Sequence, residues 1–355
     1  MSNKNIRKRL VGMTAAAAIL VTAIAGCGSN NSAAAGSAGG NTASSGATVI
    51  NIGTMDLVNA DLIARKENYY EDLLDAEVNI VSFSSGKDVN TAIASGSIDI
   101  TELGTSPSAL GISSDLGYSV VGIGDIIGSA ESLVATKDSG ISDVTDLVGK
   151  KVATPFASTA HYSLLSALKL AGVAETDVDL LDMEADDIYA AWQRGDIDAA
   201  YIWYPTLDNL LKEGGTVVTG SDVLAKEGYV TGDLIVARDE FAEENPELVT
   251  EFLEAVLKGN EIIQNDADTA AEDVSAVLGI EAEDAASQLT QFTYLTGEEQ
   301  LSEEWLGGGL AQNLKDTADF LVEQQSITSA PELEAFQAAI NTTYLEQAVQ
   351  SLAAE

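Results

Sequence analysis

The sequence predicts a two-lobed α/β fold with a helical C-terminal part. Between residues 48 and 239, short β-rich runs alternate with stretches whose apolar residues recur at helical spacing. Such alternation is typical of α/β units with largely parallel sheets. The chain has 355 residues, of which 46% are hydrophobic, so it is long and apolar enough to bury the cores of two lobes. Part of the first half is also echoed later in the chain.

The charge and the rare residues exclude several classes of protein. With 17 Lys+Arg against 56 Asp+Glu, the formal net charge of −39 repels nucleic acids and anionic lipid surfaces. A single Cys and a single His exclude an internal disulfide and the usual His/Cys zinc site. The sequence has no Walker, G-x-S-x-G or H-E-x-x-H motif. We therefore expect no enzyme activity and no catalytic residues. We also expect no cofactor and no metal.

The N-terminal residues are typical of an export signal. Basic residues precede an alanine-rich apolar run over residues 10–25 that is too short for a comfortable membrane span. Cys27 follows Ala25 and Gly26, and this pattern resembles the lipobox of bacterial lipoproteins. The resemblance implies cleavage before Cys27 and a lipid anchor on its thiol, at the outer face of the cytoplasmic membrane. Residues 28–47 carry no charge and no large apolar side chain, which predicts a flexible tether.

Strand candidates follow one another along the chain from Thr48. They cover residues 49–53, 78–83, 98–101, 120–124, 133–136, 151–153, 178–181, 199–202 and 234–237. After Asp239 the pattern becomes almost wholly helical, with Pro246 near a helix start and apolar residues at helical spacing behind it. Trp192, at helical spacing with Ile188, is interpreted as a core residue.

Two segments of the chain repeat one pattern. Residues 94–107 and 193–205 each contain a Gly that ends a helix, an Ile-Asp pair, a short strand and a Pro near the next helix start. The repeat predicts two similar lobes, each with a strand-to-helix loop. In such proteins the ligand lies between the lobes, near strand ends and helix starts, and the lobes close on it about a hinge.

Two predicted helix starts offer hydrogen-bond donors, and two further residues offer partners for a cation. Thr105 and Ser106 lie at one predicted helix start, and Ser158, Thr159 and His161 at another. A helix N-terminus holds an anion without Lys or Arg, although Ser158 or Thr159 could equally serve only as a helix cap. Candidate partners of a cation are the Trp203 ring and the Asp233 carboxylate, for which a surface position is the alternative.

Several segments closely resemble the taurine-binding proteins of bacterial ABC importers, a sulfonate/nitrate/taurine solute-binding family. They are residues 155–169, residues 190–205 with the run W-Q-R-G-D-I-D, residues 293–296, and the first-lobe loops 103–107 and 129–133. The resemblance covers roughly residues 49 to 296. It implies a periplasmic-binding-protein fold of type II, with two crossover strands near Leu133 and Leu234. Lobe 1 would comprise residues 48–132 and 238–355, and lobe 2 residues 133–237.

The same resemblance implies a ligand, partners and site residues. The ligand would be taurine or a related sulfonate, delivered by a monomeric receptor to a transmembrane permease with its ATPase; another alkanesulfonate, nitrate or a pyrimidine precursor is the alternative. A sensor or an enzyme built on this fold is a less favoured alternative function. Sulfonate oxygens only accept hydrogen bonds, so the matching donors are Thr105, Ser106, Ser158, Thr159 and His161. The candidates for the ammonium group are Asp233, Glu131 and Trp203.

The loop over residues 53–59 departs from the family pattern. Asp56 in this loop is either a second partner of the ammonium group or the cap of a helix from Leu62.

Overall fold

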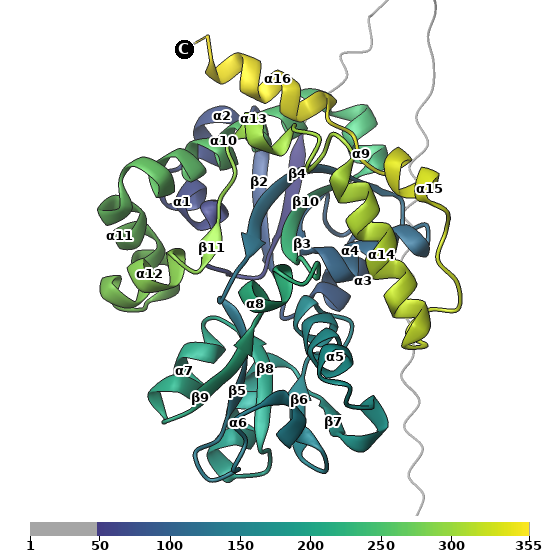
Figure 1. The fold of residues 1–355 in the computed structure, drawn as a ribbon. Helices are drawn as coiled ribbons and strands as arrows, with labels where there is room; N and C mark the ends of the chain where they lie inside the picture. Colours follow the sequence, from purple (N-terminus) through teal and green to yellow (C-terminus); the bar gives the residue numbers. More distant parts are fainter. Residues whose placement is uncertain (1–47, 355) are drawn as a thin grey trace, which may run out of the picture. The chain divides into compact units, whose positions relative to one another are not determined.

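Two separate β-sheets organise residues 48–354, which are the residues described by the computed structural model (Figure 1). The predicted export signal, the predicted anchor residue Cys27 and the predicted tether over residues 28–47 lie outside the described residues. Within the described part, every helix is too short or too polar to cross a membrane.

The six-stranded sheet has the order β11-β4-β10-β3-β1-β2 and forms the centre of lobe 1. Its strands are β1 (Val49–Thr54), β2 (Glu77–Ser82), β3 (Ile100–Gly104), β4 (Tyr118–Ile127), β10 (Gly232–Arg238) and β11 (Phe292–Thr293). The helices between the early strands are α1 (Ala60–Lys66), α2 (Tyr69–Leu73), α3 (Gly86–Ala94) and α4 (Thr105–Ser113). Buried Ile50, Ile52 and Ile100 show how β-branched residues of the central strands fill this core.

The five-stranded sheet has the order β7-β6-β8-β5-β9 and forms the centre of lobe 2. Its strands are β5 (Glu131–Ala135), β6 (Lys151–Thr154), β7 (Asp179–Asp182), β8 (Ala199–Trp203) and β9 (Thr216–Gly220). The helices are η1 (Val144–Leu147), α5 (Thr159–Ala171), η2 (Glu175–Asp177), α6 (Ala185–Arg194), α7 (Thr206–Lys212) and α8 (Ser221–Ala225). Trp192 of α6 is buried in this lobe, as its spacing predicted.

The C-terminal part is helical, as predicted. It comprises α9 (Asp239–Glu244), α10 (Pro246–Asn265), α11 (Ala267–Leu278), α12 (Ala282–Leu289), α13 (Gly297–Gln300), α14 (Gly309–Glu323), α15 (Leu333–Ala338) and α16 (Thr343–Leu352). Pro246 is the first residue of α10, where its missing N–H leaves no helical bond unmade. Phe252, Leu314 and Phe336 from these helices pack into the core of lobe 1.

The repeated pattern of the sequence is confirmed by the topology. In both sheets the strand of the repeat, β3 or β8, lies between a parallel and an antiparallel neighbour. Most strands of each sheet point the same way, as expected, but β10 and β11 in the first sheet and β5 in the second run antiparallel to their neighbours. The strand candidates are all found, whereas β9 and β11 were not predicted.

Two short links connect the lobes. Residues 128–130 lead from β4 to β5, and residues 226–231 lead from α8 to β10. The lobe 1 ends of the two links lie side by side. The Ile127 N–H, just before the first link, donates to the carbonyl of Thr231, the last residue of the second link, at 3.0 Å. The sequence-based division assigned the strand near Leu234 to lobe 2. In the structure this strand, β10, lies in the six-stranded sheet, because its backbone pairs with β3 and β4.

Side chains also join the lobes directly. Lys212 of α7 forms an ion pair with Asp284 of α12 at 2.5 Å. The Phe320 ring at the end of α14 contacts Tyr162 of α5 edge-on, with 5.0 Å between the ring centroids. The two lobes are therefore in direct contact beyond the two links.

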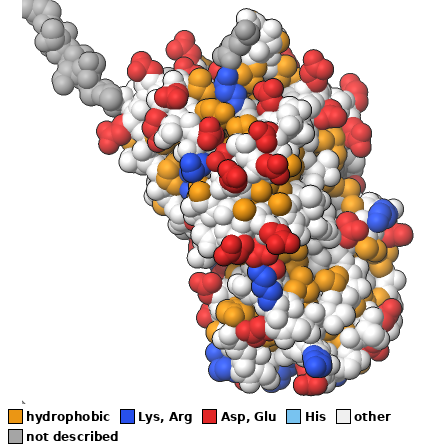
Figure 2. All heavy atoms as spheres, turned by 90° about the vertical axis from the view of Figure 1, so that its left-hand side faces the viewer, with side chains coloured by type: hydrophobic (Ala, Val, Ile, Leu, Met, Phe, Trp, Pro, Cys, Tyr) orange, Lys and Arg blue, Asp and Glu red, His pale blue; other side chains and the backbone are white. Residues whose placement is uncertain are grey.

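On the face shown in Figure 2, acidic side chains are distributed rather than gathered in one patch. Figure 2 shows them across a whole face of the molecule, with few basic side chains among them. A charge spread in this way favours solubility.

Candidate functional site

A pocket lies between the two sheets and is lined by residues of both lobes. It holds about 480 Å³ of atom-free space, part of which is open to solvent. Its lining consists of Met55, Leu57, Gly86, Gly104, Pro107, Ile127, Ala130, Glu131, Ser158, Thr159, Trp203, Tyr204, Asp233 and Phe292. The pocket therefore lies where strands end and helices begin, as predicted for the ligand site.

The N-terminus of α5 forms the lobe 2 side of the pocket. Ser158 is the helix cap: its hydroxyl accepts from the His161 N–H at 3.1 Å and donates to the Pro155 carbonyl at 2.6 Å. The Thr159 hydroxyl donates to Glu131 Oε2 at 2.6 Å. Both hydroxyl protons are thus used within the protein. What α5 offers a ligand is the backbone N–H groups of its first two residues, Thr159 and Ala160, because the His161 N–H is taken by the Ser158 cap.

The N-terminus of α4 faces α5 from lobe 1. Gly104 and Pro107 line the pocket, whereas the predicted donors Thr105 and Ser106 are buried beside it and are absent from its lining. The Thr105 hydroxyl accepts from the Gly232 N–H at 3.5 Å. The Ser106 hydroxyl is fully buried and has no hydrogen-bond partner among the described residues.

Two buried carboxylates, Glu131 of β5 and Asp233 of β10, line the pocket. Their residues are 1% and 4% exposed, and the sequence analysis had singled out both. Burial raises the pKa of Glu131 to about 8, although hydrogen bonds from Thr159 and other hydroxyls partly oppose this rise. Burial likewise raises the pKa of Asp233 to about 7. Both groups would be stabilised as anions by a nearby cation.

Two further buried carboxylates lie beside Asp233. Glu102 on β3 and Asp125 on β4 occupy the strands on either side of β10. Their pKa values are raised well above the usual range, mainly by burial and further by Asp233 and other carboxylates. No Lys or Arg side chain is present in the pocket lining formed by the described residues. The pocket therefore favours a positive charge on its ligand.

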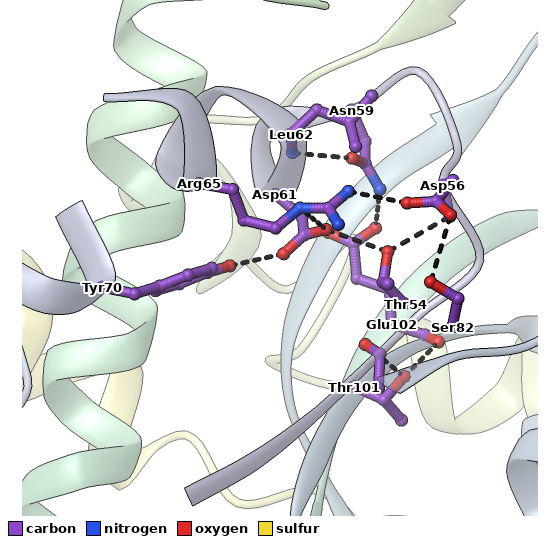
Figure 3. Close-up of polar contacts among 11 residues, drawn as sticks. Thr54, Asp56, Asn59, Asp61, Leu62, Arg65, Tyr70, Ser82, Thr101 and Glu102 are labelled. Atoms are coloured by element: carbon purple, nitrogen blue, oxygen red, sulfur yellow. Dashed lines mark hydrogen bonds and ion pairs between the residues drawn. The ribbon is translucent and has the colours of Figure 1, made fainter. Parts of the chain in front are cut away.

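Arg65 of α1 lies among acidic side chains of lobe 1 (Figure 3). Its guanidinium forms ion pairs with Asp56 at 3.0 Å and with Asp61 at 3.2 Å. Asp56, predicted as a second ammonium partner or as a helix cap, is held by Arg65 and by the Ser82 hydroxyl at 3.2 Å. The structure places Asp56 outside the pocket lining, and the cap of α1 is Asn59, which accepts from the Leu62 N–H at 3.3 Å.

His161 also lies outside the pocket lining. Its ring stacks on Phe156 with 4.3 Å between the centroids, and its Nδ1 accepts from the Ala157 N–H at 3.3 Å. Burial lowers its pKa to about 4, so the imidazole is neutral near neutral pH. Trp203, in contrast, lines the pocket beside Tyr204.

The apolar wall of the pocket was not predicted from the sequence. Met55 and Leu57 come from the loop after β1, Ile127 from the end of β4 and Phe292 from β11. Apolar side chains in loops carry no signature of their own. The nearest signals were the unusual loop over residues 53–59 and the segment 293–296, which lie next to these residues in the sequence.

The fold and the site define a class of protein: two α/β lobes joined by two short links, with a ligand pocket between them, are the architecture of bilobal solute-binding proteins. The model of the family "NMT1/THI5 like" matches residues 58–270, which is more than half of the chain. The chain belongs to this family. The taurine-binding periplasmic protein of Escherichia coli (strain K12) is 36% identical over 271 residues, covering 75% of this chain and 83% of that protein.

Solved structures share the fold. The alkanesulfonate-binding protein SsuA from Xanthomonas axonopodis pv. citri, bound to MOPS, superimposes with a TM-score of 0.70 at 20% identity, covering 83% of this chain and 99% of that one. The desulfurization enzyme DSZB superimposes with a TM-score of 0.64 at 16% identity, covering 86% of this chain and 99% of the enzyme. The fold therefore serves both binding proteins and an enzyme, and the function must be argued from the site.

The raised pKa values predict how the stability of the ligand-free protein depends on pH. For Glu131 the ordinary pKa is 4.5 and the folded-state pKa is about 8, so between these values the folded state binds more protons than the unfolded state. The free energy of unfolding then falls as the pH rises through this window, by an amount on the order of a few kcal/mol. Thermal unfolding should show a higher midpoint at about pH 5 than at about pH 8.

The general repulsion among acidic groups acts in the same direction, so a variant must separate the two effects. The Glu131→Gln substitution removes one buried titrating group and hardly changes the surface charge. Its unfolding midpoint should depend less steeply on pH than that of the original protein. Equal slopes for both proteins would contradict the assignment.

Proposed function

We propose that this protein is an extracytoplasmic solute-binding protein that captures taurine between its lobes and delivers it to an ABC permease. One observation carries the proposal: the pocket combines helix N-termini with two buried carboxylates, Glu131 and Asp233, and has no basic side chain in its described lining. A small zwitterion with an anionic and an ammonium group has the complementary charges. The similarity to a taurine-binding periplasmic protein supports taurine as this zwitterion.

The two ends of taurine suit two parts of the pocket. The sulfonate is an acceptor of hydrogen bonds, and the first turns of α4 and α5 present backbone N–H groups and the positive end of the helix dipole. The ammonium group is a donor, and Asp233 and Glu131 accept from it while the Trp203 ring favours a cation. The apolar side chains of Met55 and Leu57 can cover the short carbon chain between these ends.

The carboxyl groups of the pocket also predict how strongly the alternative ligands bind. A plain alkanesulfonate or nitrate would place a negative charge in this pocket without a compensating cation, so the buried carboxylates would have to stay protonated. These anions are therefore expected to bind more weakly than taurine. A binding function rather than an enzymatic one is supported by the lining, which contains neither Cys nor Lys among the described residues.

Calorimetric titration of the Asp233→Asn variant tests the proposed ligand. We expect the original protein to bind taurine at least about tenfold more tightly than ethanesulfonate, because only taurine gains a charge-assisted hydrogen bond to Asp233. The variant should lose most of this preference. Asp196→Asn is the matched control, since Asp196 lies on the surface of lobe 2 and pairs with the exposed Arg194 at 2.7 Å. An unchanged ratio of the two affinities in Asp233→Asn would sink the assignment of the ammonium site.

The cellular location is part of the proposal. The basic residues, the apolar run and Cys27 support export and a lipid anchor, which would hold the receptor next to its permease and ATPase. Detergent-phase partitioning of the full chain tests the anchor. The expressed protein should enter the detergent phase and the Cys27→Ser variant should stay in the aqueous phase. Equal partitioning would argue against the anchor.

A further inference from the structure

Glu131 is surrounded by hydroxyl groups that all come from lobe 2. Thr159 donates to one carboxylate oxygen at 2.6 Å, and Ser163 and Ser221 donate to the other at 3.4 and 3.2 Å. We call these three residues the hydroxyl cluster. Ser163 and Ser221 are fully buried and absent from the pocket lining, so they act on a ligand only through Glu131.

A second layer supports the hydroxyl cluster. The Ser163 and Ser221 hydroxyls lie 3.1 Å apart, and the hydroxyl of Tyr201 lies 3.2 Å from that of Ser221. Tyr201 of β8 is completely buried, and burial raises its pKa, so it keeps its proton and can donate it toward Ser221. Ser221 is then free to donate its own proton to Glu131. Each hydrogen bond of such a chain polarises the next one.

The hydroxyl donors favour one protonation state of Glu131. An ionised carboxylate only accepts hydrogen bonds, whereas a protonated one must also donate. Three hydroxyl donors therefore match the ionised form of Glu131, and their bonds oppose the effect of burial on its pKa. The other titratable groups that act on Glu131 are Asp233 on β10, Asp125 on β4 and Tyr201 on β8. The two carboxylates among them work against ionisation.

The position of Ser221 adds a structural consequence. Ser221 opens α8, which leads directly into the second link over residues 226–231, while Glu131 follows the first link over residues 128–130. The hydrogen bond between them thus joins the start of β5, next to the first link, to the helix that precedes the second link. Ser221 therefore helps to fix the position of the Glu131 carboxylate next to the links.

We propose that Ser221, supported by Ser163 and Tyr201, is a positioning residue that orients the Glu131 carboxyl group toward the pocket and favours its ionised form, and so makes the pocket selective for ligands with an ammonium group. The inference rests on the proposed function, because it assumes that the ligand cation meets Glu131. It goes beyond that function by assigning a role to residues that the ligand does not touch.

The first arm of the test needs no ligand. The ¹³C signal of the Glu131 carboxyl group, assigned by its loss in Glu131→Gln, is followed against pH in the ligand-free protein. We expect the titration midpoint of Glu131 to move upward by about one pH unit in Ser221→Ala, because one donor to the anion is lost. Tyr201→Phe should move it in the same direction by less, and it keeps the packing of the ring should Ser221→Ala fail to fold.

The second arm measures taurine affinity against pH by calorimetry. In Ser221→Ala we expect a loss of about threefold to tenfold near pH 7, shrinking at higher pH as Glu131 ionises anyway. Ser166→Ala is the control: Ser166 is a fully buried serine of α5 that donates to the Tyr162 carbonyl at 2.8 Å. A folded Ser221→Ala or Tyr201→Phe variant with an unshifted Glu131 midpoint overturns the inference. Failure of taurine to bind any variant, with the midpoint shifted, overturns the proposed ligand instead.

Discussion

Replacing Gly104 by Ala is expected to weaken ligand binding strongly without destabilising either lobe. A Cβ atom on Gly104 would lie 2.8 Å from Cγ2 of Thr159, which is closer than real Cβ contacts. Gly104 belongs to lobe 1 and Thr159 to lobe 2, so the added methyl group would keep the lobes apart. Overpacking of this kind costs about 1–3 kcal/mol, which corresponds to roughly fivefold to 150-fold in the dissociation constant.

The backbone of Gly104 does not require glycine, since its φ of −54° is open to any residue. The variant should therefore unfold at nearly the same temperature as the original protein in the absence of ligand. Calorimetry measures the affinity, and the double variant Gly104→Ala with Thr159→Ser supplies the control. Serine removes the obstructing methyl group and keeps the hydroxyl that donates to Glu131. Affinity should largely return in the double variant, and its continued loss would show that the contact does not limit closure.

The fold was predictable because its signals are local. The repeated run of Gly, Ile-Asp and strand records a helix end and a strand start, and both copies lie at equivalent places in the two sheets. The direction of β5 and β10 was not predictable, because strand pairing depends on contacts between residues far apart in the chain. The same reason explains why the sheet that contains the strand near Leu234 could not be assigned.

The candidate site was predictable only where polar residues occupy a helix start or a strand end. Ser158, Thr159, Trp203 and Asp233 meet this condition and line the pocket, whereas Thr105 and Ser106 meet it and are buried beside the pocket. Glu131, which also lines the pocket, was named only by the family resemblance. Other polar residues carry no such mark. Ser221 belongs to no motif, and its relation to Glu131 depends on how β9 and α8 return to β5 in space.

The acidity of the chain has two different consequences. On the surface, the negative charge is dispersed and screened within about 10 Å at moderate salt. Inside, Glu102, Asp125, Glu131 and Asp233 are withdrawn from water and lie at or beside the pocket. From the sequence, neutral donors at two helix starts were expected to bind the anionic end of the ligand, and Asp233 and Glu131 its ammonium group. Because burial raises their pKa values, these carboxyl groups ionise most readily beside a cation, and this favours a ligand that carries an ammonium group over one that is only an anion.

Replacing Arg65 by Met is expected to lower the free energy of unfolding by about 3 kcal/mol or more, because breaking a buried ion pair leaves its partner uncompensated. That partner is Asp61, whose side chain is only 6% exposed. Asp61 also accepts hydrogen bonds from Tyr70 at 2.7 Å and Thr54 at 3.1 Å, so it cannot turn toward solvent without breaking them (Figure 3). Chemical denaturation measures the change.

Two variants decide whether the cause is the uncompensated charge. Arg194→Met removes a pair with Asp196 at 2.7 Å whose side chains are 61% and 54% exposed, and it should cost no more than about 1 kcal/mol. The double variant Arg65→Met with Asp61→Asn removes the buried charge together with its partner and should recover much of the lost stability. Equal losses in Arg65→Met and Arg194→Met would contradict a buried pair. Because Arg65 also holds Asp56 between the lining residues Met55 and Leu57, the single variant should bind ligand more weakly as well.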